Sequence, residues 1–362
     1  MSLTCGERFM RCLTGQPIDR VPFGVGIGWA PWGETYERWK VESGDPALDV
    51  GKTLGFDLSC AGAKIYQGLW PEFAYEVLEK TDDYITARDG RGIVMRNRRD
   101  MHSMPLFLEH PVKDQADWTR IKTERLRVDD PSRVAEDWPA FRRRMQESGE
   151  AVQVGWFPYG VFGTPRDLMG AEEVLMAFYT DPEMIEDMMT HLTDVWLAVW
   201  ERVAAETQIG HIHIWEDMSG RQGSLISPAM VKAFMMPCYD RIAAFAQAHG
   251  VRVVSVDTDG DCAELVPIMM EHGVNTFFPF EVAAGNDIEA YRRQYPTLGI
   301  IGGLDKRALA AGKAEIDREV EKAARMVKHG RYIPAFDHLI PPDVPWENFV
   351  YAAEQTRKLC GG

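Results

Sequence analysis

The sequence lacks the features that mark membrane, secreted and nucleic-acid-binding proteins. No apolar run approaches the roughly 20 residues of a membrane-spanning helix, and the opening MSLTCGERFMRCLTG has no apolar segment typical of a secretory signal. The 6 cysteines form no CxxC pair and no disulfide framework. Basic residues are scarce: 40 Lys and Arg stand against 55 Asp and Glu, and the net charge of -15 repels phosphate backbones and anionic lipid. We therefore expect a cytoplasmic protein with reduced thiols that binds neither nucleic acid nor a membrane.

The remaining composition is that of a soluble enzyme with a large core. Hydrophobic residues make up 45% of the chain and charged residues 26%, which are ordinary values for a globular protein. A length of 362 residues accommodates two or three domains or one large α/β barrel. No GxGxxG motif follows the first predicted strand, which argues against a doubly wound dinucleotide-binding sheet.

Short apolar segments rich in β-branched and aromatic residues, bounded by Gly, Pro or Asp, are predicted as strands. They cover residues 21–27, 56–62, 152–157, 209–215, 251–256, 274–280, 297–303 and 331–336. Each is followed by a helical pattern or by a long insertion, which is typical of parallel βα units. Eight such units predict an α/β fold of the (β/α)8 TIM-barrel class.

Several helix ends are readable in the sequence. One broad apolar face predicts a helix over 183–206. Ser227, followed by Pro, is expected to cap a helix in which Pro237 introduces a kink. Asp261 and Asp287 stand where they would cap the next two helices.

An insertion after the second strand interrupts this alternation. It covers about 63–150, and within it DDYITARDGRGIVMRNR (82–98) is predicted as a hairpin with its turn at Asp89-Gly90. We predict one domain over 1–362, with 63–150 as a hairpin-containing insertion or cap.

Polar residues are concentrated at the carboxyl ends of the last five predicted strands, where the active site of a barrel lies. The carboxylates there are Glu216 and Asp217, Asp257 and Asp259, Glu281, Asp305, and Asp337. An aspartate at such a position can simply cap a helix, but glutamate is a poor cap. A cluster in one mouth must share protons, bind a cation or pair with Lys306 and His338. We predict catalytic roles for Glu216, Asp257, Lys306 and His338.

Aromatic residues follow the first and third strands. Trp29 and Trp32 come after 21–27, and Trp156 and Tyr159 come at the end of 152–157 and beyond it. They either form walls for a flat or apolar substrate or pack in the core. We predict that they contact the substrate together with Asp305.

Two histidines alternate with isoleucines in 209–215. His211 and His213 therefore share one face of that strand and are predicted to point inward, as core residues or in support of the site. Cys60 ends the second strand and is predicted to be a buried thiol.

Long motifs in the second half of the chain resemble a known superfamily. They are WEDMSGRQGSLISPAMVKAFMMPCYDRI, VVSVDTDGD, PFEVAAGND, IGGLDKRAL and YIPAFDHLIPPDVPWENF. The chain resembles the uroporphyrinogen decarboxylase superfamily, in its decarboxylase-like branch related to corrinoid-dependent methyltransferases. The resemblance extends over nearly the whole chain, and it implies a (β/α)8 barrel and, in many members, a homodimer.

The resemblance implies two chemistries, and the chain departs from both patterns. Decarboxylases carry an Arg-rich stretch after strand one that binds porphyrinogen propionates, but here GVGIGWAPWGETYERWK has tryptophans instead. A polyanionic tetrapyrrole needs several cations, so porphyrinogen itself is disfavoured. The methyltransferase branch holds zinc with a His-x-Cys pair after strand five and a Cys after strand eight. The matching positions here are Asp257, Asp259 and about Phe336, so that thiolate site cannot form.

Two arrangements remain open for the site. Glu216, Asp257, Glu281 and His338 would hold zinc or another divalent metal, or no metal binds and Asp257 or Glu216 acts as a general acid or base. The leading hypothesis is a methyltransferase that moves a methyl group from a small O-, N- or S-methylated substrate to a corrinoid (cobalamin) on a partner protein. The alternatives are a decarboxylase or lyase in which Lys306 binds a small carboxylated substrate or forms a Schiff base, and a non-catalytic binding protein.

Overall fold

The computed structural model describes residues 2–99, 104–135 and 137–361. Its centre is a seven-stranded parallel sheet with the strand order β1-β6-β7-β10-β11-β12-β13. The strands are β1 (Cys60–Gly62), β6 (Ala151–Gly155), β7 (Ile209–Trp215), β10 (Val253–Thr258), β11 (Thr276–Pro279), β12 (Gly299–Ile301) and β13 (Tyr332–Ile333). Each falls within or overlaps a predicted strand, and neighbours in the sequence are neighbours in the sheet. The expected α/β class with parallel βα units is therefore confirmed.

The prediction of an eighth strand over 21–27 is wrong. Gly24 and Gly26 adopt φ values of 73° and 96°, which a continuous extended strand cannot contain, and a 3-10 helix (Ile27–Trp29) follows. The segment still lies between the two edges of the sheet, next to the edge strands β1 and β13. The Asp57 amide, next to β1, donates to the Phe23 carbonyl at 2.8 Å. Further along, Trp29 Nε1 donates to the carbonyl of Pro334, just after β13, at 2.9 Å. An irregular segment therefore lies where the closed barrel would have its first strand.

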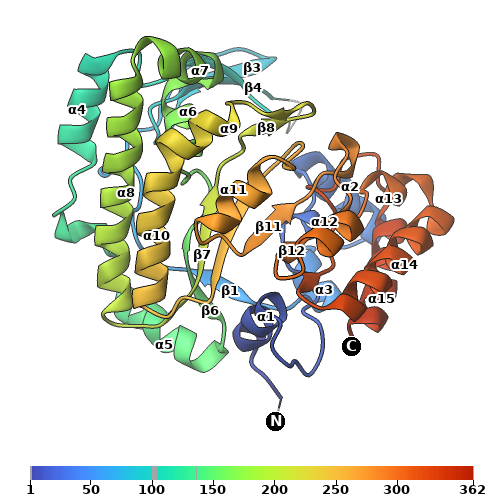
Figure 1. Cartoon of the computed structure of the whole chain (residues 1–362). Helices are drawn as coiled ribbons and strands as arrows, with labels where there is room; N and C mark the ends of the chain where they lie inside the picture. The colour runs from blue at the N-terminus through green and yellow to red at the C-terminus, as the bar shows by residue number, and fades with distance from the viewer. Residues whose placement is uncertain (1, 100–103, 136, 362) are drawn as a thin grey trace.

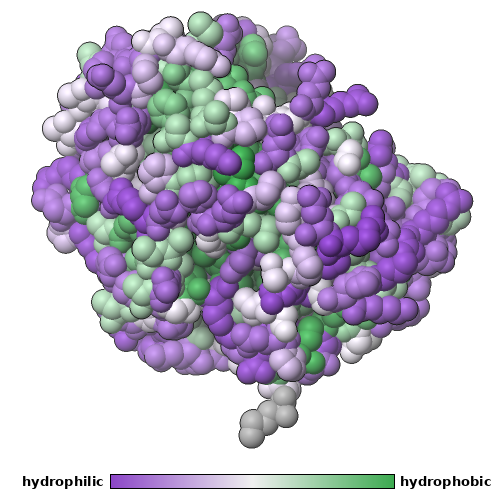
Figure 2. Space-filling view, in the orientation of Figure 1, coloured by the Kyte–Doolittle hydropathy of each residue, from purple (hydrophilic) through white to green (hydrophobic). Residues whose placement is uncertain are grey.

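The helices surround the sheet, with α8 and α10 on one side and α13 to α15 on the other (Figure 1). They are α1 (Cys5–Thr14), α2 (Gly33–Ser43), α3 (Val50–Leu54), α4 (Gln115–Arg125), α5 (Trp138–Ser148), α6 (Gly163–Met169), α7 (Ala171–Thr180), α8 (Pro182–Ala204), α9 (Pro228–Met230), α10 (Met236–Ala248), α11 (Leu265–Glu271), α12 (Ile288–Gln294), α13 (Arg307–Ala311), α14 (Lys313–His329) and α15 (Trp346–Cys360). Among the described residues, no helix combines the length and apolar character that a bilayer span requires. Hydrophilic side chains cover most of the face in Figure 2, with hydrophobic ones in smaller areas between them.

The predicted helix signals are mostly confirmed. The helix over 183–206 is α8, Ser227 accepts a hydrogen bond from the amide at the third position of α9, and Asp287 caps α12. The chain forms a π-helix (Val231–Met235) immediately before the turn with Pro237, because proline has no N–H for the carbonyl four residues earlier. Asp261 is not a cap: α11 begins later, and Asp261 accepts from the Ala263 amide in the preceding turn.

The segment 63–150 contains a separate antiparallel sheet. Its strands are β2 (Glu76–Lys80), β3 (Tyr84–Arg88), β4 (Val94–Arg98) and β5 (Leu106–Glu109), in that order. The predicted hairpin is the β3–β4 pair, and Asp89 closes its turn by accepting hydrogen bonds from the amides of Arg91 and Ile93. Every side chain of the two outer strands, β2 and β5, is exposed.

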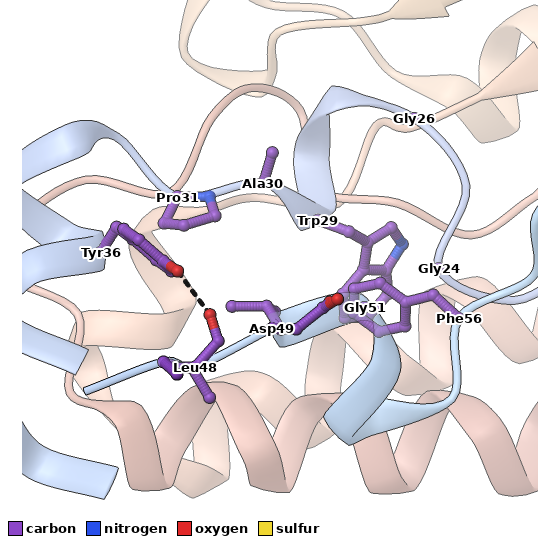
Figure 3. A pocket seen from close by; sticks show the side chains of 12 residues that line it. Gly24, Gly26, Trp29, Ala30, Pro31, Tyr36, Leu48, Asp49, Gly51 and Phe56 are labelled. Atoms are coloured by element: carbon purple, nitrogen blue, oxygen red, sulfur yellow. Dashed lines mark hydrogen bonds between the residues drawn. The ribbon is translucent and has the colours of Figure 1, made fainter. Parts of the chain in front are cut away.

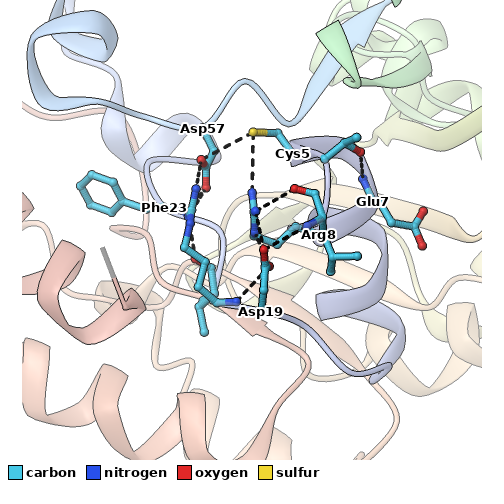
Figure 4. A network of polar contacts seen from close by, with 10 residues as sticks. Cys5, Glu7, Arg8, Asp19, Phe23 and Asp57 are labelled. Carbon is cyan, nitrogen blue, oxygen red and sulfur yellow. Dashed lines mark hydrogen bonds and ion pairs between the residues drawn. The ribbon is translucent and has the colours of Figure 1, made fainter. Parts of the chain in front are cut away.

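A network of partly buried charges attaches the N-terminal segment to the edge of the parallel sheet (Figure 4). Asp57, which precedes β1, accepts two hydrogen bonds from the Arg20 guanidinium at 2.6 and 2.7 Å and one from the Phe23 amide at 2.9 Å. Beside it, Arg8 pairs with Asp19 at 2.8 Å. Burial raises the pKa of Asp57, but the hydrogen bonds from Arg20 and Phe23 outweigh it and hold the pKa below its usual value. The segment 20–23 is thereby fixed against the sheet.

We predict that Asp57→Asn lowers the free energy of unfolding by about 3 kcal/mol at neutral pH, because it leaves a partly buried guanidinium without its charge partner. In the unaltered protein, the contribution of Asp57 is complete above the ordinary aspartate pKa and is lost as the pH falls through the lower pKa of the folded state. Denaturant titration at pH 7 and at pH 3 measures both effects. Glu76→Gln removes the exposed pair with Arg88 and is the control, with an expected change of at most about 0.5 kcal/mol. Equal effects of the two variants would contradict the prediction.

Candidate functional site

Backbone strain marks one end of the parallel sheet. Trp156, Asp217 and Phe280 have φ values of 112°, 40° and 59°, and they follow the carboxyl ends of β6, β7 and β11. Residues other than glycine rarely adopt such angles, and where they do they are concentrated at functional sites. A fourth such residue, Arg331, precedes β13 and lies at the opposite end of its strand. Three of the four therefore surround the mouth in which the sequence predicts the site.

Two carboxylates and an imidazole come together in this mouth. One oxygen or nitrogen atom each of Asp259, Glu281 and His338 lies within 4.8 Å of the others. His338 Nε2 is 3.3 Å from Asp259 Oδ2. Burial lowers the pKa of His338, but the hydrogen bond and charge of Asp259 outweigh it and hold the pKa above its usual value. Glu281 accepts hydrogen bonds from Lys306 Nζ at 3.2 Å and from the Gly260 amide at 3.0 Å.

This donor set fits a divalent ion. Carboxylate oxygens and a neutral imidazole are ligands that zinc, manganese and ferrous iron accept, and the three side chains are only partly buried. Of the four predicted metal ligands, the structure brings Glu281 and His338 into the group. Asp259 takes part, whereas Asp257 and Glu216 do not belong to it.

Glu216 points away from the mouth into the protein. It is completely buried, and its two oxygens accept hydrogen bonds from the amides of Val161, Phe162 and Gly163 at 2.7 to 3.0 Å and from the Tyr239 hydroxyl at 2.6 Å. Burial raises the pKa of Glu216, and these four hydrogen bonds oppose the rise. The carboxylate thus holds the loop that leads into α6.

Asp257 lies at the end of β10, deeper than Asp259. It is largely buried, and burial, followed by the negative charges of Asp259 and Asp217, raises its pKa well above the usual value. Its Oδ2 lies 3.7 Å from Nε2 of His213. Asp217 pairs with Arg166, which also donates to the Asp217 carbonyl at 2.8 Å. Arg166 and the predicted Lys306 are therefore each paired with a carboxylate.

The predicted substrate-contacting residues separate into two groups. Trp32 stacks on His338 with ring centroids 5.9 Å apart, and Trp156 is 46% exposed beside the mouth. Trp29 is buried and donates to the Pro334 carbonyl at 2.9 Å, so it packs in the core. Tyr159 lines a different cavity, next to 68–69 and 167–168. Asp305 accepts hydrogen bonds from the amide and the guanidinium of Arg307.

Two cavities that are larger than the one beside Tyr159 share one wall. The outer cavity has a volume of about 510 Å³ and is lined by Trp29, Tyr36, Asp49 and Phe56, among others (Figure 3). Its polar groups are already engaged, since Tyr36 donates to the Leu48 carbonyl and Asp49 caps α3. The inner cavity has a volume of about 340 Å³. Residues of the irregular segment 24–30 line both cavities.

The inner cavity contains the histidines that the alternation in 209–215 predicted to point inward. His211 and His213 are buried and line it together with Cys60. Burial raises the pKa of the Cys60 thiol, so it stays protonated. Gln153 of β6 and Ser255 of β10 bind these histidines. Neither residue stands out in the sequence pattern, although each occupies a central strand with apolar neighbours, where a polar side chain needs a partner.

Comparison with known proteins agrees with this architecture. The family model of uroporphyrinogen decarboxylase (URO-D) matches residues 98–359. A uroporphyrinogen decarboxylase of Xanthomonas axonopodis pv. citri (strain 306) is 23% identical over 381 residues, covering 98% of both chains. The solved structure of a methyltransferase from Methanosarcina mazei aligns with a TM-score of 0.61 and 16% identity over 99% of both chains, which shows a common fold. Since the family model matches well over half of the chain, the protein belongs to the uroporphyrinogen decarboxylase family.

Proposed function

We propose that this protein is a methyltransferase. In this proposal it takes a methyl group from a small O-, N- or S-methylated substrate and passes it to a corrinoid on a partner protein. The observation that carries the proposal is the group of Asp259, Glu281 and His338 at the mouth. It supplies ligands for a divalent ion at an end of the sheet where Arg166 and Lys306 are already paired. Porphyrinogen propionates would need free cations there.

The residues of the mouth have separate tasks in this mechanism. Asp259, Glu281 and His338 would hold the ion, which when bound polarises the heteroatom that carries the methyl group. Trp32 stacks on His338 and restricts its ring orientation. Asp257, buried between this group and His213, is the proposed proton donor to the departing heteroatom, which keeps the electron pair of the broken bond. The methyl group would leave without its bonding pair towards the open side, where a reduced corrinoid on the partner would supply the electron pair for the new bond.

A second candidate function is supported by Lys306. Its ammonium lies at the mouth, 3.2 Å from Glu281, and could turn to the carboxylate of a small substrate. The similarity to a decarboxylase over 98% of both chains favours this alternative, a carboxy-lyase. It requires that Lys306 leave Glu281, whereas methyl transfer with a bound metal requires only that the metal replace the ammonium at that carboxylate.

We predict that the purified protein binds about one divalent ion per chain, and that Asp259→Asn and His338→Gln each lower the affinity for it at least about tenfold. Elemental analysis and metal titration measure this. The matched control is Asp240→Asn with His272→Gln, because these residues form a carboxylate–imidazole pair at 2.6 Å on the surface. A protein without bound metal, or site variants that retain it like the control, would count against the metal-assisted mechanism and favour acid–base chemistry by Asp257.

Methyl transfer itself is tested with a panel of methylated compounds and a reduced corrinoid protein. The expected result is a change of the corrinoid spectrum on methylation together with the demethylated product by mass spectrometry. Asp259→Asn and His338→Gln are expected to slow it at least about 100-fold. Release of carbon dioxide from a carboxylated compound, abolished in Lys306→Ala, would instead establish the lyase, and ligand binding without any turnover would favour a non-catalytic binding protein.

Glu216→Gln is predicted to act through stability. A glutamine would direct an NH2 group at amide donors that the carboxylate now satisfies, and we expect a loss of about 3 kcal/mol in the free energy of unfolding. Denaturant titration measures it, with Glu201→Gln, which removes an exposed contact to His249, as the control. Unchanged stability with lost activity would instead place Glu216 in the chemistry.

A further inference from the structure

The lining of the inner cavity is largely apolar, and its polar members are Asp57, Ser59, Gln153, His211 and His213. Phe9, Phe278, Ile301 and the Trp156 ring supply apolar walls. A continuous chain of polar groups runs from β6 across β7 to β10, through Gln153, His211, Ser255 and His213. In a low-dielectric interior every donor needs an acceptor, so such a chain determines which nitrogen of each histidine carries the proton.

The first two bonds of the chain define the state of His211. Its Nδ1 lies 2.9 Å from Oε1 of Gln153, which can only accept, so Nδ1 carries the proton. Burial lowers the pKa of His211 to about 3, and the ring is therefore neutral. Its Nε2 is then an acceptor, and the Ser255 hydroxyl at 2.7 Å donates to it.

The same reasoning defines His213. Because the Ser255 proton is directed to His211, its oxygen accepts from Nδ1 of His213 at 3.3 Å. Burial lowers the pKa of His213 well below its usual value, and the neighbouring His211 lowers it further. The neutral ring thus presents a lone pair at Nε2. Among the described residues, that nitrogen is buried and has no hydrogen-bond partner. The nearest carboxyl oxygen, Oδ2 of Asp257, lies 3.7 Å away, beyond hydrogen-bond distance.

The orientation of His213 is fixed by its neighbours. The Trp156 and Phe278 rings lie 4.6 and 4.9 Å from its ring, so it cannot turn freely to find another partner. The one charged side chain among the cavity's described lining residues is Asp57, whose oxygens are engaged by Arg20 and Phe23. The cavity therefore offers an acceptor at His213 and an unpartnered hydroxyl at Ser59, but its described lining residues include no cation.

We infer that the inner cavity binds the substrate of the proposed methyl transfer, and that His213 Nε2 accepts a hydrogen bond from a hydroxyl or N–H group of a neutral, largely apolar molecule. This inference rests on the proposed function for its place in a reaction, but its binding chemistry stands separately. A ligand without a donor leaves the buried nitrogen unsatisfied. A carboxylate would enter without any cation to compensate its desolvation.

Three probes of similar size separate these cases: 4-methoxyphenol, 1,4-dimethoxybenzene and 4-methoxybenzoate. Calorimetric titration of the full chain, without any corrinoid, is expected to give at least about fivefold tighter binding of 4-methoxyphenol than of the other two. In His213→Phe, the advantage of 4-methoxyphenol over 1,4-dimethoxybenzene is expected to vanish. Thr193→Ala, which removes a buried hydroxyl of α8 away from the cavity, is the control and keeps the advantage.

Ser255→Ala gives a readout that a purely structural role would not produce. Without the serine oxygen, the proton of His213 is free to move to Nε2, which then donates, so the preference is expected to shift towards the acceptor-only 1,4-dimethoxybenzene. Equal binding of the probes, tightest binding of 4-methoxybenzoate, no binding of any probe, or a preference that survives His213→Phe would overturn the inference. Preferred binding of 4-methoxyphenol without any methyl transfer would support the binding inference and overturn the proposed function. Methyl transfer from an anionic donor would support the proposed function and overturn the binding inference.

Discussion

The mouth of the sheet depends on the burial of one carboxylate. Glu216 has no solvent contact, so its charge is tolerated only because four donors surround it. Those donors belong to the loop before α6 and to α10, and they fix the first turn of α6. That helix carries Arg166, which binds both the backbone and the carboxylate of Asp217. The strained end of β7 and its paired cation are thus held by a residue that does not itself face the mouth.

Polarity changes sharply with depth below this mouth. The outer level contains partly exposed polar side chains, namely Asp259, Glu281, His338 and Lys306. One layer down, the imidazoles of β7 are neutral and are linked by hydroxyl and amide groups. Such a gradient lets charge act on a reacting atom at the top while the remainder of a bound molecule lies in apolar surroundings. The proposed methyl transfer uses both levels.

The sequence predicted the strands and the end of the sheet that carries polar residues, because alternation and strand-end position are local properties. It failed where the outcome depends on distant partners. Glycines in 21–27 have no side chain to show that the backbone there turns left-handed. Glu216 and Glu281 both follow strands, yet only contacts from elsewhere in the chain decide that one binds backbone amides and the other faces the mouth. Asp257 and Asp259 are two residues apart, and the point where β10 ends separates a buried acid from a partly exposed one.

Within the described part of the chain, the outer edges of β2 and β5 pair with no further strand, and the side chains of both strands are exposed. Unpaired edges with apolar side chains such as Val77, Leu78 and Phe107 are templates on which further strands can add, as in fibril growth. The charges at the ends of these strands, Glu76 and Lys80 on one and Glu109 on the other, oppose such addition because each new strand would have to desolvate them. These acidic and basic side chains therefore oppose association of the chain through its strand edges at high concentration.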